Sequence, residues 1–229
     1  MRLKSMAGIL AAAAVFVLAT AMPTHAQSFL ISPKGEKKWM EYFYRANGEA
    51  PAPKPSTLID GGIGFVFTTT PDVALFMTGH PGYNQILLGD LSGKSSVYAA
   101  YTVNAGISAF NYYGQGTPSN PCGALASVRL YFSTNNNDLG ESQYWWSNPT
   151  GLPLASGPGI LNASFDPSQW SDRDGHSGTF DAAHTAAFNA AKADVQHMGL
   201  SFGGGCFFAN GVGNASGTAT FVLNDFSVN

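Results

Sequence analysis

The loop Phe165–Gly178 gathers acidic residues that could bind a cation. Its centre reads Asp172-Arg-Asp174-Gly, a spacing that lets two carboxylates and a backbone carbonyl converge on one hard cation such as Ca²⁺. The loop lacks the distal Glu of an EF-hand, so the motif is incomplete. Asp172 and Asp174 are therefore metal candidates, against the more common role of Asp in capping turns and helix starts.

The aromatic residues after position 143 could contact a ligand. Tyr144-Trp-Trp146 lies on an expected strand and Trp170 in the loop that follows, and flat aromatic faces suit the C–H faces of sugar rings. Neighbouring residues of a strand point to opposite faces, so one of the paired Trp residues is expected in the core. The candidate ligand-binding residues are Tyr144, Trp146, Trp170, Arg129 and Asp172.

Catalytic motifs are incomplete. Gly199-Leu-Ser-Phe-Gly203 fits the G-x-S-x-G pattern of a nucleophile elbow, but the glycine-rich stretch after it gives no sign of the helix that an elbow needs. A glycosidase needs two positioned carboxylates, and only Glu141 among the Glu residues lies beyond position 56. We assign no catalytic residue, and a hydrolase using Ser201 or the Asp loop is the least favoured alternative.

The histidines give no metal-binding pattern in the sequence. His80, His176, His184 and His197 show no paired spacing of the kind that zinc sites use. We therefore expect structural or solvent-facing roles for them.

The N-terminus has the three zones of a secretory signal. Arg2 and Lys4 precede an uncharged apolar stretch, Met6–Ala21, and Thr24 and Ala26 supply the small residues of a cleavage site. The apolar stretch is shorter than the roughly 20 residues of a spanning helix. We expect residues 1–26 to be a signal peptide, no membrane span in the mature chain, and secretion to the periplasm or beyond the cell.

Two cysteines remain after such cleavage, Cys122 and Cys206. An oxidising compartment would allow them to pair, and a bridge closing so long a loop could contribute roughly 4 to 5 kcal/mol. Two buried free thiols are the alternative.

Charge is sparse, at 11% of residues, while 13% are aromatic and Gly is abundant. This composition suits strands and turns and argues against disorder. After position 56 the basic residues are few and scattered, so we expect no nucleic-acid partner.

Strand patterns alternate with turn formers from residue 63 onward. One Ala-rich helix is expected at about 180–196, and residues 27–56 look like an N-terminal arm with a short helix near 37–44 and a Pro-rich linker. Residues 57–229 then form one β-sandwich. The expected strands are 63–69, 73–77, 96–103, 127–133, 143–147, 160–165, 198–202 and 217–228.

Several stretches of the C-terminal half carry a family resemblance: 128–132, 144–149, 170–172 and 199–213. They resemble a group of exported bacterial proteins whose layout is similar to galactose-binding-like jelly rolls, the fold of many carbohydrate-binding modules. The resemblance implies an all-β jelly-roll sandwich and a structural Ca²⁺ near the last strand, where this chain has Asn224 and Asp225. It implies no other cofactor.

These observations predict a secreted, non-catalytic β-sandwich that binds a polysaccharide or cell-surface glycan. A structural envelope or matrix protein without a small ligand is the alternative. The two differ in a simple way, because Trp146 and Trp170 should line one exposed groove if the protein binds glycans and should be buried apart if it does not.

Overall fold

A computed structural model describes residues 39–44, 51–79, 87–106, 109–118, 125–134, 143–148, 151–204 and 208–229. The expected signal peptide, Cys122 and Cys206 lie outside these residues, so their predicted roles stay predictions. In the part of the chain that is described, no helix is long and apolar enough to cross a membrane.

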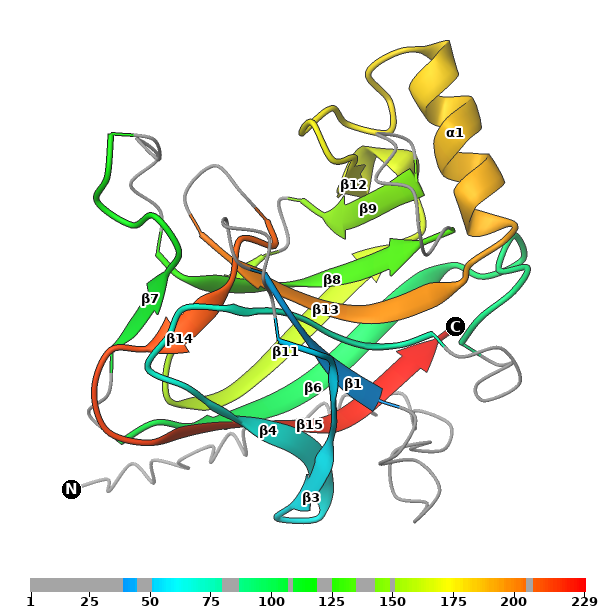
Figure 1. Cartoon of the computed structure of the whole chain (residues 1–229). Coiled ribbons are helices and arrows are strands. Elements are labelled where there is room, and N and C mark those ends of the chain that lie inside the picture. The colour runs from blue at the N-terminus through cyan, green and yellow to red at the C-terminus, as the bar shows by residue number, and fades with distance from the viewer. Residues whose placement is uncertain are drawn as a thin grey trace, which may run out of the picture.

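Two antiparallel sheets pack into a sandwich (Figure 1). The larger sheet has the order β12-β9-β8-β13-β5-β1-β2, with three short strands, β7, β10 and β14, joined at its side, and the smaller has the order β11-β6-β15-β4-β3. The strands of the larger sheet are β1 Trp39–Phe43, β2 Lys54–Pro55, β5 Val73–Thr78, β7 Phe110–Tyr112, β8 Ser127–Ser133, β9 Tyr144–Ser147, β10 Leu152–Pro153, β12 Trp170–Ser171, β13 His197–Gly203 and β14 Val212–Asn214. Those of the smaller sheet are β3 Thr57–Ile59, β4 Gly62–Phe67, β6 Ser96–Asn104, β11 Gly157–Ser164 and β15 Ala219–Val228.

The eight strands expected from the sequence pair in the nested pattern of a jelly roll. The first of these eight, β4, pairs with the last, β15; β5 pairs with β13, β6 with β11, and β8 with β9. This is the pairing of one long antiparallel hairpin that has been rolled into two layers. The predicted all-β sandwich with one helix is therefore confirmed, and the eight strands expected from the sequence are present.

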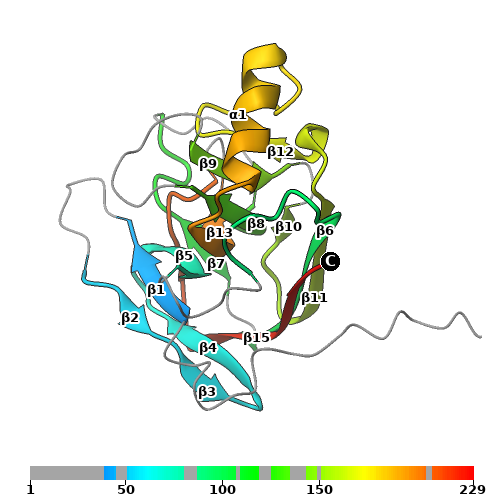
Figure 2. The same cartoon turned by 90° about the vertical axis from the view of Figure 1, so that its right-hand side faces the viewer.

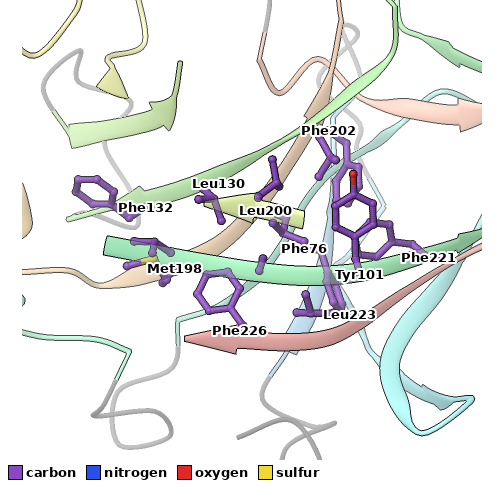
Figure 3. Close-up of a cluster of buried hydrophobic side chains, with 14 of the residues drawn as sticks. Phe76, Tyr101, Leu130, Phe132, Met198, Leu200, Phe202, Phe221, Leu223 and Phe226 are labelled. Carbon is purple, nitrogen blue, oxygen red and sulfur yellow. The ribbon is translucent and has the colours of Figure 1, made fainter. Parts of the chain in front are cut away.

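The alternation of buried and half-buried side chains explains why these segments form strands with one face on the core. Along β6 the residues Val97, Ala99, Tyr101 and Val103 are buried and those between them are only half-buried, which is the period of two expected of a strand with one face on the core. Figure 3 shows the result, with side chains from both sheets meeting in one apolar layer. Fully burying each such Phe or Leu contributes about 1.5–3 kcal/mol.

The N-terminal segment corrects the sequence expectation. Residues 39–43 form a strand, not a helix: β1 pairs with β5 and with β2, and Trp39 is 2% exposed against Phe76 and Phe226. The described residues of the expected arm and linker thus contribute β1 and β2 to the larger sheet. The charged residues of this segment hid the strand pattern in the sequence, although the β5 residues that pair with β1 are almost all apolar.

The expected helix is α1, Ala182–Lys192, and it lies at one end of the sandwich beside β9 and β12 (Figures 1 and 2). Asp181 caps its N-terminus by accepting a hydrogen bond from the backbone N–H of His184. Phe188 anchors the helix, being fully buried against Trp145 and Trp170. The helix therefore holds its first turn in a fixed place above the loop that precedes it.

Candidate metal centre

The loop between β12 and α1 folds back on itself directly after β12. Ser171 and Ser177 form a β-bridge, and the backbone N–H of Asp172 donates to the carbonyl of His176 at 2.9 Å. Gly175 completes the turn with φ of 87°, a conformation that glycine adopts without a steric cost. The tight turn brings Asp172 and His176 together on one side. We call residues 172–184 the loop–helix corner.

The side chain of Asp172 is buried, with 0% exposure, and each of its oxygens has a distinct role. Oδ1 accepts hydrogen bonds from the backbone N–H groups of Asp174 (3.0 Å) and His176 (2.8 Å). These bonds fix the carboxylate so that Oδ2 faces two imidazole rings, 3.4 Å from Nε2 of His184 and 3.6 Å from Nδ1 of His176.

His184 is oriented by a second carboxylate. Its Nδ1 lies 2.7 Å from Oδ1 of Asp181, the N-cap residue of α1. Hydrogen bonds from the backbone and the side chain of His184 hold the pKa of Asp181 below its usual range. An ionised Asp181 favours a proton on Nδ1 and leaves Nε2 with the lone pair that a metal needs, as in carboxylate–histidine–zinc arrangements.

The third aromatic ring of the corner belongs to Phe180. It packs on His176 with a centroid distance of 4.5 Å and meets His184 at 5.0 Å in an edge-on arrangement. Phe180 is 62% exposed, so these rings form the outer surface of the corner and Asp172 its floor.

The three potential ligand atoms, from Asp172, His176 and His184, all lie within 4.8 Å of one another. A zinc ion with bonds of about 2.0–2.2 Å at tetrahedral angles separates neighbouring ligand atoms by roughly 3.3–3.5 Å. The two oxygen–nitrogen distances, 3.4 and 3.6 Å, are therefore close to those of a loaded site. The two imidazole nitrogens lie within 4.8 Å of each other, so the rings would move together by up to about 1.5 Å to bind one ion.

One member of this group, Asp172, is a metal candidate expected from the sequence, whereas Asp174 contributes its backbone N–H and its carboxylate is not part of the group. His176 and His184, whose spacing gives no zinc pattern in the sequence, converge on Asp172 in the structure. The available signals were the four-residue spacing from Asp172 to His176 and the Asp181-x-x-His184 pattern of a helix start.

Trp170 corrects the prediction of an exposed aromatic groove. Its side chain has 0% exposure, packs between Phe132 and Phe165, and donates from Nε1 to the carbonyl of Ser164 at 2.7 Å. β12 pairs with β9 and directs this ring into the core. Trp146 lies in a separate cluster and is 7% exposed, so no groove is shared by the two rings.

Three of the predicted binding residues, Tyr144, Trp146 and Arg129, do gather on the outer side of the larger sheet. The stacked rings of Tyr144 and Trp146 lie beside Tyr131 and Phe208, and Arg129 covers the Phe208 ring at 4.6 Å. Trp145 points the opposite way, into the core, as expected for neighbours on a strand. We call this group, with Arg129, the aromatic face.

Buried donors distinguish the aromatic face from an ordinary apolar cluster. Nε1 of Trp146 and Nε of Arg129 are buried and make no hydrogen bond with the residues that the structure describes. Burial lowers the pKa of Arg129, whose Nη1 donates to the carbonyl of Ser147 at 3.1 Å. Tyr144 and Arg129 are half-buried, so the edge of the face reaches the surface.

The remaining candidates have structural positions. Ser201 is fully buried within β13 and pairs with Arg129 and Leu75 on the neighbouring strands, so it is not at a nucleophile elbow. Asn224 donates to Thr102 beside a bulge in β15. Among the described residues, the one group of three convergent His, Cys, Asp or Glu side chains is that of the loop–helix corner.

Searches with this chain match neither a family model nor a curated protein.

Proposed function

We propose that this protein is an exported β-sandwich that binds a divalent transition-metal ion, with zinc as the expected ion, at Asp172, His176 and His184. The observation that carries the proposal is the placement of one fixed carboxylate oxygen 3.4 and 3.6 Å from two imidazole nitrogens. Export rests on the sequence of residues 1–26.

The donor set favours zinc over the calcium expected from the Asp loop. Ca²⁺ takes six to eight oxygen ligands, whereas imidazole nitrogens suit Zn²⁺, Cu²⁺ and Ni²⁺. Two of the three converging atoms are nitrogens. The hydrogen bond from His184 to Asp181 also supplies the supporting carboxylate that zinc-bound histidines commonly have.

Binding would also brace this end of the sandwich. An ion held by Asp172 and His184 links the end of β12 to the first turn of α1. Metal that binds only the folded chain raises its stability by mass action. The ion should therefore raise the melting temperature of the protein.

The test is a zinc titration of the purified mature chain by isothermal calorimetry. We expect one Zn²⁺ per chain, and a loss of more than a hundredfold in affinity for His184→Ala, beyond the roughly 10–100-fold that supporting residues cost. Asp174→Asn is the matched control, because its carboxylate is adjacent but outside the ligand group, and it should bind zinc normally. Equal affinity of His184→Ala and the unmodified chain would refute the proposal.

Glycan binding remains a second candidate function, although Trp146 and Trp170 are buried apart and do not form the groove expected from the sequence. Its support is the edge of the aromatic face, where the half-buried Tyr144 stacks on Trp146 and Arg129 is half-buried beside them. A glycan array with the mature chain tests this function, with Tyr144→Ala as the variant that should lose binding. If neither a glycan nor zinc binds, the alternative that the protein is a structural envelope protein becomes the better supported one.

A further inference from the structure

Two tyrosines lie in contact with each other at the surface, away from the metal centre and the aromatic face. The rings of Tyr44 and Tyr113 meet edge-on, with 6.0 Å between their centroids and an interplanar angle of 79°. Tyr44 is 44% exposed and Tyr113 is 43% exposed, so solvent reaches both rings. Neither the proposed zinc binding nor glycan binding uses this pair.

The sheet topology explains why two residues so far apart in the sequence meet. Tyr44 directly follows β1, and Tyr113 directly follows β7. A row of paired residues crosses the larger sheet just before them, made of Phe43, Val73, Val212 and Tyr112. Each tyrosine thus follows one end of this row, and the two rings meet across the start of β5.

Backbone hydrogen bonds hold both residues in place. The N–H of Tyr44 donates to the carbonyl of Asp72 at 2.8 Å, and the N–H of Tyr113 donates to the carbonyl of Gly211 at 3.1 Å. The carbonyl of Tyr113 also accepts a hydrogen bond from Nδ2 of Asn210 at 2.9 Å. Exposed side chains change rotamer within picoseconds to nanoseconds, so the rings can turn toward each other while the sheet stays in place.

The pair is also the most accessible oxidisable aromatic group of the described chain. Phenol and indole rings lose single electrons to peroxide-derived oxidants, and all four tryptophans are buried, at 7% exposure or less. The other tyrosines that the structure describes are less exposed than the pair: Tyr101, Tyr112 and Tyr131 are buried, and Tyr42, Tyr98 and Tyr144 are half-buried. An oxidant in solution therefore meets Tyr44 and Tyr113 first among these residues.

We propose that Tyr44 and Tyr113 are an oxidative cross-linking site, at which the two rings are joined as a dityrosine. An oxidant of the haem peroxidase class, driven by hydrogen peroxide, removes one electron and one proton from each phenol. The two radicals form a carbon–carbon bond between the ring carbons next to the hydroxyl groups, and each of these carbons then passes its hydrogen to the phenol oxygen. One hydrogen peroxide accepts the two electrons and two protons and becomes two molecules of water.

The bond would fasten two parts of the larger sheet that pair with different neighbours. In the described part of the chain β1 pairs with β2 and β5, and β7 pairs with β14. The cross-link would close a loop of about 70 residues, and the lost chain entropy corresponds to a rise in melting temperature of roughly 10 °C for a chain of this size. The proposal is independent of zinc binding.

The test is oxidation of the dilute mature chain with a haem peroxidase and hydrogen peroxide, followed by mass spectrometry of the monomer. We expect a monomer lighter by two hydrogen atoms, dityrosine fluorescence, and one linked peptide pair that contains Tyr44 and Tyr113. The melting temperature of the oxidised monomer should be higher by roughly 10 °C than that of the untreated chain.

Phenylalanine variants separate the cross-link from the packing of the rings. Tyr44→Phe and Tyr113→Phe each keep the ring and remove the phenol oxygen, so each should lose both the link within the monomer and the rise in melting temperature. Melting curves recorded before oxidation show that these variants are folded. Tyr98→Phe is the matched control, because Tyr98 is half-buried on β6, and it should cross-link like the unmodified chain.

Three results would overturn the proposal. An oxidised monomer of unchanged mass, or links between molecules alone, would mean that the two rings do not reach each other. Linked peptides that contain other tyrosines would place the site elsewhere. A Tyr44→Phe monomer that still loses two hydrogen atoms would exclude this pair.

Discussion

Acidic and aromatic side chains lie in opposite environments in the body of the larger sheet and in the loop–helix corner. In the sheet, Glu41 is 8% exposed and burial raises its pKa to about 7. In the corner, hydrogen bonds from His184 lower the pKa of Asp181. Burial thus favours the neutral form of Glu41 in the sheet, whereas hydrogen bonds from His184 favour the ionised form of Asp181 in the corner.

Two residues of one short segment show the same contrast. Trp170 on β12 turns into the core with 0% exposure, and Asp172 two positions later directs an oxygen at two histidines. At this end of the molecule the large ring of Trp170 packs in the core. The candidate metal ligands are smaller side chains, placed by the turn at Gly175 and by the N-cap of α1. Candidate sites in such a sandwich are therefore better sought at helix starts than at tryptophans.

The largest expected effect concerns the core side of this contrast. Trp170→Ala should lower the free energy of unfolding by about 3–5 kcal/mol, because it leaves a cavity between Phe132, Phe165 and Phe188. Chemical denaturation monitored by circular dichroism measures the change. Tyr144→Ala, at a half-buried position of the aromatic face, is the comparison and should cost less; equal losses would place Trp170 outside the core.

Acid should release the metal from the corner. An imidazole must be neutral to bind an ion, and free histidine side chains take up a proton near pH 6.5. With two histidine ligands, zinc affinity should fall up to about a hundredfold per pH unit well below that value. Competition with a zinc chelator across pH 5–8 measures it; affinity that stays constant over this range would exclude histidine ligation.

The supporting carboxylate should matter less than a ligand. Asp181→Asn should weaken zinc binding by about tenfold, because it removes the charge that holds the proton on Nδ1 of His184. Asn is as good an N-cap as Asp, so α1 should keep its stability. Calorimetric titration and thermal melts of the metal-free chain separate the two; a lower melting point with unchanged affinity would make Asp181 a capping residue alone.

A further effect lies in the sheet and depends on pH. Glu41 has a folded pKa of about 7, above its usual value of 4.5, chiefly because of burial. The folded chain then holds a proton that the unfolded chain loses, so stability falls as pH rises from about 4.5 through 7. Glu41→Gln should be more stable than the unmodified chain at pH 8 and equal to it at pH 4; the same difference at both values would contradict the assignment.

Local patterns predicted much of the fold. The eight strands expected from the sequence and α1 follow from alternation, turn formers and alanine content, which are properties of short windows. β1 was missed because Glu41 and its charged surroundings look exposed, whereas the residue lies within the sheet beside Lys54. The short strands β10, β12 and β14 pair with longer neighbours, and β7 pairs with β14, so tertiary pairing rather than a local pattern defines them.

The site was harder to predict because it depends on two separate local features of the chain. Gly175 turns the chain so that Asp172 meets His176, and Asp181 begins α1 at the residue that places His184 above them. Both features are visible in the sequence, but the side chains of Asp172, His176 and His184 converge only because Phe188 anchors α1. Trp170 was misassigned because a tryptophan flanked by loop residues has the same local sequence whether it faces solvent or the core.

The most direct test of the metal centre is the X-ray absorption spectrum of the zinc-loaded mature chain. We expect a first shell of nitrogen and oxygen at about 2.0–2.2 Å with the outer scattering of two imidazoles, and the loss of one imidazole in His184→Ala. A shell containing sulfur, or oxygen alone without imidazole scattering, would contradict zinc binding by Asp172, His176 and His184.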